Sequence, residues 1–265
     1  MFIDQAFSYR LESAEFLPSI EWIDALAHHR PDLGAERQMV AGGWMMYGGP
    51  QSPANHIIGM GLGGPVSEEE IDCVEDFYRR HRSICEIVVS PYADMSLPTH
   101  LGKRGYRITE WNSVLARKVD PAERFDIGGF DIRPVQKDEA LHWANIMARG
   151  FDTYPGVSPE MFMPLATASN AMCFLAYMDG QPAGGAAGSL FRRERIAPLY
   201  GAATLPEFRN RGVQNALFRA RLHRAAAAGC ELAVVCSQPG TVSQRNAERN
   251  GFQVAYTKVA MQREV

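Results

Sequence analysis

A turn rich in Arg, Asn and Gly is the part of this sequence whose residues are best suited to bind a ligand. The turn, Arg209-Asn-Arg-Gly-Val-Gln214, lies between an apolar run and a long Ala-rich stretch. If that stretch is helical, the turn presents unpaired backbone N–H groups at a helix N-terminus, where the helix dipole favours an anion. Arg209 and Arg211 would add charge-assisted donors, and Gly212 would let the backbone approach the ligand without a Cβ. No Asp or Glu occurs between Asn210 and Cys230, so we predict a diphosphate-binding turn.

The elements around this turn read as a strand, a helix and a second strand. Residues 199–204 are an apolar strand, 213–228 a helix that Gly229 ends, and 232–236 a short buried strand. Such a unit pairs its two strands in parallel. Before it, residues 173–178 and 182–191 predict a hairpin around Asp179-Gly180. An opening strand at 131–134 and a helix over 139–150 precede the hairpin.

The N-terminal half contains a comparable helix with opposite charge at its start. Strands are expected near residues 38–47 and 56–61, and a helix begins at Ser67. The run Ser67-Glu-Glu-Glu70 is a capping box with further carboxylates in the first turn. These carboxylates satisfy the helix N-terminus and would repel a diphosphate, whereas the helix that follows Gly212 is left open for one.

The two halves echo each other at a spacing of about 146 residues. Cys85-Glu-Ile-Val-Val-Ser-Pro resembles the segment that begins at Cys230, and Arg104-Gly-Tyr106 resembles Asn250-Gly-Phe252. Residues 114–119 likewise resemble 260–265. The common order indicates a duplicated unit. We therefore expect domains at 1–120 and 130–265, with a linker at 121–129.

Composition limits the classes of function. The net charge of −3 leaves no basic footprint for nucleic acid or an anionic membrane. Residues 1–10 lack the apolar stretch of a secretory signal, and no stretch approaches the roughly 18 apolar residues of a membrane span. The five cysteines form no CxxC pair, which favours reduced thiols in the cytoplasm. The histidines lack metal-ligand spacing, so we expect no metal site.

With these elements in place, the C-terminal half resembles the Gcn5-related N-acetyltransferase (GNAT) superfamily. The family's acyl-CoA loop reads Gln/Arg-x-x-Gly-x-Gly/Ala; Arg209 and Gly212 match it, and Gln214 departs from the small residue. The Gly251-Phe252 ending of the last helix also fits. The resemblance covers residues 130–265 and extends to 36–120 as a degenerate copy without the loop. It implies an α/β fold of two tandem acetyltransferase-like domains, each a central mixed sheet flanked by helices.

The resemblance also implies the residues that hold acetyl-CoA, the expected cosubstrate. Backbone groups on the strand would pair with the pantetheine arm, amides of the loop would hold the diphosphate, and a serine in the last helix would lie near the thiol arm. The strand residues are Ala202, Ala203, Thr204 and Leu205. The loop residues are Arg209, Asn210, Arg211, Gly212, Val213, Gln214 and Asn215, and the serine is Ser243. The tyrosine that many members use as an acid is replaced by Ala247.

The implied reaction is direct transfer of an acetyl group from acetyl-CoA to an amine in a ternary complex. An alkyl amine with a pKa of about 10.4 is almost fully protonated at neutral pH, so a base or relay is needed. The candidates are Tyr200, Glu194 and Ser237, with Asp152 or Tyr154 after the first helix. Cys236 as the nucleophile of a ping-pong mechanism is an alternative. A non-catalytic acyl-CoA-binding regulator, or a site for another nucleotide, remains open, and the chain is expected to be a monomer or homodimer.

Overall fold

The computed structural model describes residues 2–123, 125–151 and 158–265. They fold as two compact units. The first unit comprises the chain up to Val114 together with Cys236–Thr241 and Val254–Val265, and the second comprises Leu115–Val235 and Val242–Gln253. These units differ from the predicted domains because the end of the chain joins the first unit. There the last strand pairs with a strand of the N-terminal half, from Val259 opposite Val89 to Arg263 opposite Cys85.

The first unit is a mixed sheet in the order β1-β2-β3-β4-β11-β5, in which β3 and β4 are parallel. Its elements are α1 (Gln5–His29), η1 (Pro31–Leu33), β1 (Glu36–Val40), β2 (Gly43–Tyr47), β3 (Ile57–Ile58), α2 (Glu68–Arg80), β4 (Cys85–Val89), α3 (Ser96–Lys103), β5 (Arg107–Lys118) and β11 (Gln253–Arg263). The predicted strand near 38–47 is the hairpin β1–β2, and α2 begins after Ser67 as predicted.

Sequence reasoning missed α1, the longest helix of the first unit. Its buried face includes Glu12 and Ser13 among apolar residues, which obscures the helical pattern of hydrophobicity. The carboxylate of Glu12 is 2.9 Å from the ammonium of Lys258 and accepts a hydrogen bond from Tyr256 at 2.7 Å. The polar residue is therefore buried because its partners come from the other end of the chain.

The second unit is a sheet in the order β10-β9-β8-β7-β6. Its elements, after the end of β5, are β6 (Asp131–Pro134), η2 (Lys137–Glu139), α4 (Ala140–Gly150), α5 (Pro159–Thr167), β7 (Phe174–Met178), β8 (Gln181–Gly188), β9 (Ile196–Thr204), η3 (Pro206–Phe208), α6 (Val213–Ala227), β10 (Leu232–Ser237) and α7 (Val242–Arg249). The predicted hairpin is confirmed, with left-handed backbone at Asp179 and Gly180. The β9–α6–β10 unit is confirmed as well, since β9 and β10 are parallel.

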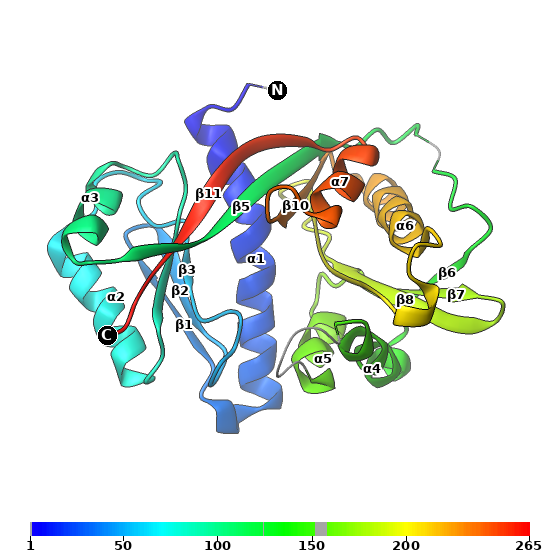
Figure 1. Cartoon of the computed structure of the whole chain (residues 1–265), viewed down its shortest axis with the longest axis horizontal. Helices are drawn as coiled ribbons and strands as arrows, with labels where there is room; N and C mark the ends of the chain where they lie inside the picture. Colours follow the sequence, from blue (N-terminus) through cyan, green and yellow to red (C-terminus); the bar gives the residue numbers. More distant parts are fainter. Residues whose placement is uncertain (1, 124, 152–157) are drawn as a thin grey trace. The chain divides into compact units, whose positions relative to one another are not determined.

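Small residues of β8 let helices pack closely on both faces of this sheet. A Cβ at Gly184 would lie 3.3 Å from Val213 of α6, and one at Gly185 would lie 2.9 Å from Trp143 and Met147 of α4. Successive strand residues point to opposite faces. Helix α6 therefore covers one face and α4, with α5 beside it, covers the other, as Figure 1 shows.

The two copies of the Gly-aromatic motif end their helices in the same way. Gly105 and Gly251 both have φ of +81°. The N–H of Tyr106 donates to the carbonyl of Leu101 at 3.0 Å, and the N–H of Phe252 donates to Ala247 at 3.2 Å. Each motif is followed by a long strand, β5 or β11. The repeat in the sequence is thus a repeat of strand, helix and strand.

Two further observations concern the cysteines and the hydrophobicity of the helices. All five cysteines are free thiols. Within residues 2–123, 125–151 and 158–265, no helix is both long and apolar enough to cross a membrane.

Candidate functional site

The N-terminus of α6 is open, as the sequence predicts. Gly212 is its N-cap with φ of +91°, no side chain caps it, and its first turn contains no acidic residue. The first amides of a helix have no partner inside it, which leaves the N–H groups of Val213, Gln214 and Asn215 directed out of the helix end. A Cβ at Gly212 would meet only the Phe130 ring, at 3.7 Å, so this glycine is required by its backbone conformation rather than by space.

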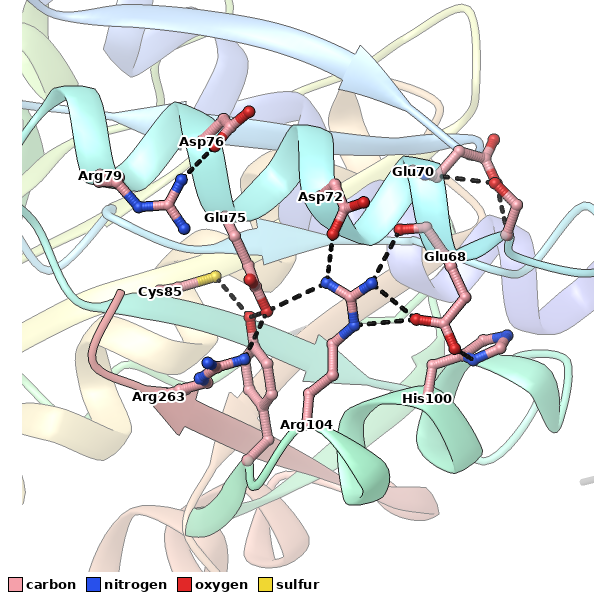
Figure 2. A network of polar contacts seen from close by, with 12 residues as sticks. Glu68, Glu70, Asp72, Glu75, Asp76, Arg79, Cys85, His100, Arg104 and Arg263 are labelled. Carbon is pink, nitrogen blue, oxygen red and sulfur yellow. Dashed lines mark hydrogen bonds and ion pairs between the residues drawn. The ribbon is translucent and has the colours of Figure 1, made fainter.

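The corresponding end of α2 in the first unit is filled with charge. Ser67 and Glu70 form the two reciprocal hydrogen bonds of a capping box. Arg104 bridges Glu68, at 2.6 Å, and Asp72, also at 2.6 Å. Figure 2 shows this guanidinium held between the carboxylates of the first turns of α2. The hydrogen bond from Arg104 holds the pKa of the Glu68 carboxyl below its ordinary value. The amides at this helix end are thus capped by Ser67, and the carboxylates of Glu68 and Asp72 are paired with Arg104.

The repeat places Asn250 of the second unit where the first unit has Arg104. The side-chain amide of Asn250 donates to Asn215 of the first turn of α6 at 3.1 Å and to the carbonyl of Asn246 at 2.8 Å. Asn246 in turn donates to the side chain of Gln214 at 2.6 Å. Neutral amides therefore join α7 to the start of α6. Gln214, which departs from the family's loop pattern, is held against α7 by this bond.

A cleft of about 550 Å³ lies at this helix end, and it is basic. The edge of β9, the loop before α6, the end of α4 and one face of α7 line it: Gly150, Phe151, Ala202, Ala203, Thr204, Phe208, Arg209, Asn210, Gly212, Val213, Gln214, Asn215, Val242, Arg245, Asn246 and Arg249. Among these described residues there are three arginines and no carboxylate. The guanidinium of Arg209 donates to the carbonyl of Gly150 at 3.3 Å.

Arg245 and Arg249 are lining residues that sequence reasoning missed. They lie four residues apart on α7, and Val242 lies three residues before Arg245, so all three share one helix face. This spacing was visible in the sequence. What it could not show is that the face turns toward the first turn of α6, which follows from the bonds of Asn246 and Asn250.

Three of the residues expected at the ligand lie outside the cleft. Leu205 is 1% exposed, and its N–H donates to the carbonyl of Ala183 at 2.9 Å, so that amide is already used within the sheet. The guanidinium of Arg211 lies 3.7 Å from the sulfur of Met178. Ser243 follows Val242 on α7 but does not line the cleft. The other predicted binding residues border the cleft: Ala202, Ala203, Thr204, Arg209, Asn210, Gly212, Val213, Gln214 and Asn215.

Strand β9 leaves its parallel neighbour β10 before it reaches the cleft. The register of β9 with β10 ends at Pro198 opposite Val234. Beyond it, β9 remains paired with β8, and the register shifts so that Tyr200 lies opposite Ala187 and Ala202 opposite Ala186. Gly201 has no register partner and takes a φ of +48°. The strand therefore bulges directly before the residues that line the cleft.

The predicted proton-transfer residues are dispersed over the fold. Tyr200 is half-buried on β9, and its hydroxyl lies 2.6 Å from that of Ser189. Glu194 is exposed in the turn between β8 and β9, and Ser237 ends β10 in the first unit. Asp152 and Tyr154 lie outside the described residues.

Cys236 has the environment of an inert thiol. It belongs to the first unit, where its Sγ donates to the carboxylate of Glu15 at 3.3 Å. Burial, and then the negative charge of Glu15, raise the pKa of Cys236 well above its ordinary value. Because the thiolate is the nucleophile, this arrangement argues against the ping-pong alternative.

Comparison with known proteins relates the cleft and its helices to a protein family. A model of the acetyltransferase (GNAT) family matches residues 140–252, which hold the cleft, the α6 loop and α7. Residues 140–252 therefore form a GNAT-family domain. A comparison with curated proteins returned no match. Among solved structures, this GNAT protein is similar to a GCN5-related N-acetyltransferase from Kribbella flavida, with a TM-score of 0.66 and 16% identity over 96% of this chain and 94% of that one.

A second solved structure bears on the repeat. A tandem GNAT protein from the clavulanic acid biosynthesis pathway matches with a TM-score of 0.62 and 12% identity, covering 95% of this chain and 96% of that one. At this identity the likeness concerns the fold alone. It agrees with the predicted class, a mixed α/β fold of the tandem GNAT type.

Proposed function

We propose that this GNAT protein is an acetyl-CoA-dependent N-acetyltransferase whose donor site is the cleft at the N-terminus of α6. The observation that carries the proposal is the combination of an uncapped, acid-free helix end with a cleft whose described lining residues include three arginines and no carboxylate. A diphosphate satisfies the exposed amides and is favoured by the helix dipole. Arg245 and Arg249 supply donors for further phosphate oxygens of the cosubstrate.

The edge of β9 suits the pantetheine arm. Ala202, Ala203 and Thr204 border the cleft with backbone groups and small side chains. The arm carries two amide groups, which can hydrogen-bond to such an edge in the manner of an added strand. This orientation directs the thioester toward the bulge at Gly201, where β9 has left β10.

The proposed reaction needs no covalent enzyme intermediate. The neutral amine attacks the thioester carbonyl carbon; a C–N bond forms, the C–S bond breaks, and the proton lost by the amine is balanced by protonation of the departing thiolate. A backbone N–H at the bulge of β9 donates to the carbonyl oxygen as it gains charge. Of the predicted candidates, Tyr200 adjoins this bulge, and we assign proton transfer to its hydroxyl, with Glu194 and Ser237 as the alternatives to be tested.

The first unit is proposed not to bind a second acyl-CoA. Its helix end at α2 carries Glu68, Glu69 and Glu70 where α6 carries Val213, Gln214 and Asn215. These carboxylates would repel a diphosphate. We therefore expect one binding site per chain.

Calorimetric titration of the intact chain with acetyl-CoA and with CoA tests the proposal, followed by thiol release in the presence of a panel of primary amines. One site per chain together with amine-dependent thiol release is the expected result. Tight binding without release for any amine would favour the acyl-CoA-binding regulator. Displacement of CoA by a simple nucleotide at equal concentration would favour another nucleotide as the ligand. The absence of binding would overturn the assignment of the cleft.

A further inference from the structure

A fully buried arginine in the second unit has no carboxylate partner among the residues that the structure describes. Arg221 of α6 is 1% exposed, and the titratable side chains that influence its pKa, Cys173 and Tyr200, are a thiol and a phenol rather than carboxylates. Its Nε donates to the carbonyl of Leu217 in the same helix at 3.1 Å, and its guanidinium lies 4.8 Å from the centre of the Phe218 ring. Its Nη2 has no hydrogen-bond partner in the described part of the chain. An ion pair within the core does not account for this cation.

Burying such a charge is costly. An unpaired ion in a protein interior loses its favourable hydration, and an apolar side chain of similar volume is often the more stable choice. Burial lowers the pKa of Arg221 to about 10, which still leaves the group protonated at neutral pH. The guanidinium is therefore positively charged at neutral pH, and its contacts must be examined to explain why it is buried.

Arg221 contacts the bulge of β9 and the strand opposite. Its Nη1 donates to the carbonyl of Ala187 at 2.9 Å and to the carbonyl of Tyr200 at 3.3 Å. These two residues are register partners, and the register shift occurs immediately beside them. One guanidinium thus binds both strands at the position where Gly201 is left without a partner.

The contact acts on one particular peptide group. The carbonyl of Tyr200 and the N–H of Gly201 belong to the same peptide bond. A hydrogen bond from a cation to that carbonyl polarises the group and strengthens its N–H as a donor. In a site of low polarity this effect is larger than it would be in water.

We propose that Arg221 is a positioning residue that holds the β9 bulge and polarises the Tyr200–Gly201 peptide group toward the carbonyl of the bound thioester. The proposal rests on the proposed function, because it assigns that carbonyl to the bulge at Gly201, directly before Ala202 of the cleft lining. Arg221 does not touch the acyl-CoA in this scheme. It acts through the backbone of β9, so its loss affects turnover more than binding.

Three variants separate this role from general support of the core. Arg221→Met removes the charge and both strand contacts, Arg221→Lys keeps the charge without the planar fork, and Arg224→Met removes an exposed arginine of the same helix. The expected result is a fall in kcat for thiol release of about 10²-fold in Arg221→Met, the size of losing one oxyanion donor. CoA affinity should stay within about threefold, Arg221→Lys should recover part of kcat, and Arg224→Met should match the wild type. A kcat for Arg221→Met within threefold of the wild type would overturn the proposal.

Amide hydrogen exchange provides a second readout that needs no activity. If Arg221 holds the bulge, the amides of Gly201 and Ala202 exchange faster in Arg221→Lys than in the wild type, while amides of β7 do not change. Equal exchange at Gly201 in the wild type and in Arg221→Lys would refute the claim that Arg221 holds the bulge. This comparison does not require Arg221→Met to fold. A wild-type protein that binds no CoA would instead refute the proposed function, and the exchange comparison would still decide whether Arg221 holds the bulge.

Discussion

Replacing Gln214 with Glu would place a carboxylate in the first turn of α6, as in the first turn of α2. Position 214 is the second residue of α6, and the second residue of α2 is Glu69. Glu is almost isosteric with Gln and keeps the acceptor oxygen that receives the hydrogen bond from Asn246. The change therefore adds one negative charge to the cleft with little change in shape. A Gly212 substitution is a less specific test, because φ of +91° would strain any other residue.

Two effects of opposite sign follow from that charge. A carboxylate in the first turn interacts favourably with the helix dipole and stabilises the folded chain by about 0.3–1 kcal/mol. The same carboxylate would face a bound diphosphate at close range. Two unit charges 4 Å apart repel by about 1 kcal/mol in water and about 4 kcal/mol near a protein surface. Since about 1.4 kcal/mol is a factor of ten in Kd, this range corresponds to CoA binding that is weaker by about fivefold to several hundredfold.

Calorimetry with CoA and thermal unfolding of the same samples measure both effects. The expected outcome is a higher Kd with an unchanged or higher Tm, and a penalty that shrinks as salt shortens the Debye length from about 10 Å at 0.1 M. Gln253→Glu, at an exposed residue outside the lining of the cleft, is the control for net charge. A Kd for Gln214→Glu within twofold of the wild type, with Tm preserved, would refute the assignment of the diphosphate to this helix end.

Further predictions concern the charges and thiols around the site. Arg249→Ala should weaken CoA binding about three- to tenfold in calorimetry, with a smaller loss at high salt, because it removes one charge-assisted donor from the cleft. With a thiol-specific dye at pH 8, the exposed Cys73 should react quickly and the half-buried Cys236 much more slowly; labelling of native Cys236 as fast as that of Cys73 would contradict the raised pKa of its thiol. Lys258→Met should cost about 3–5 kcal/mol in urea unfolding, because it leaves the carboxylates of Glu12 and Glu15 without their cation. Burial by itself raises the pKa of Glu15, but Lys258 outweighs it and the pKa lies below 4.5, so this contribution should be present above about pH 4.5 and be lost as pH falls through the lowered pKa.

Local chemistry made the starts of α2 and α6 predictable. The capping box at Ser67 and the acid-free turn before Val213 are decided by residues within four positions of each other, and both appear as expected. The hairpin at Asp179-Gly180 is predictable for the same reason, since its left-handed turn depends on two adjacent residues. The repeat was also visible, because both copies of the Gly-aromatic motif need the same left-handed glycine.

Contacts between distant residues decided the rest. The sequence by itself determined that α6 begins with free amides, but it did not show that α7 adds Arg245 and Arg249 to the cleft, because bonds from Asn246 and Asn250 orient α7. The hydrophobic pattern did not reveal α1 either, although Asp4 caps its N-terminus. Glu12 of that helix is buried only because Lys258, far along the chain, supplies its counter-charge. Backbone caps and turns depend on neighbours in sequence, whereas buried charges and cleft walls depend on neighbours in space, and only the tertiary structure brings those together.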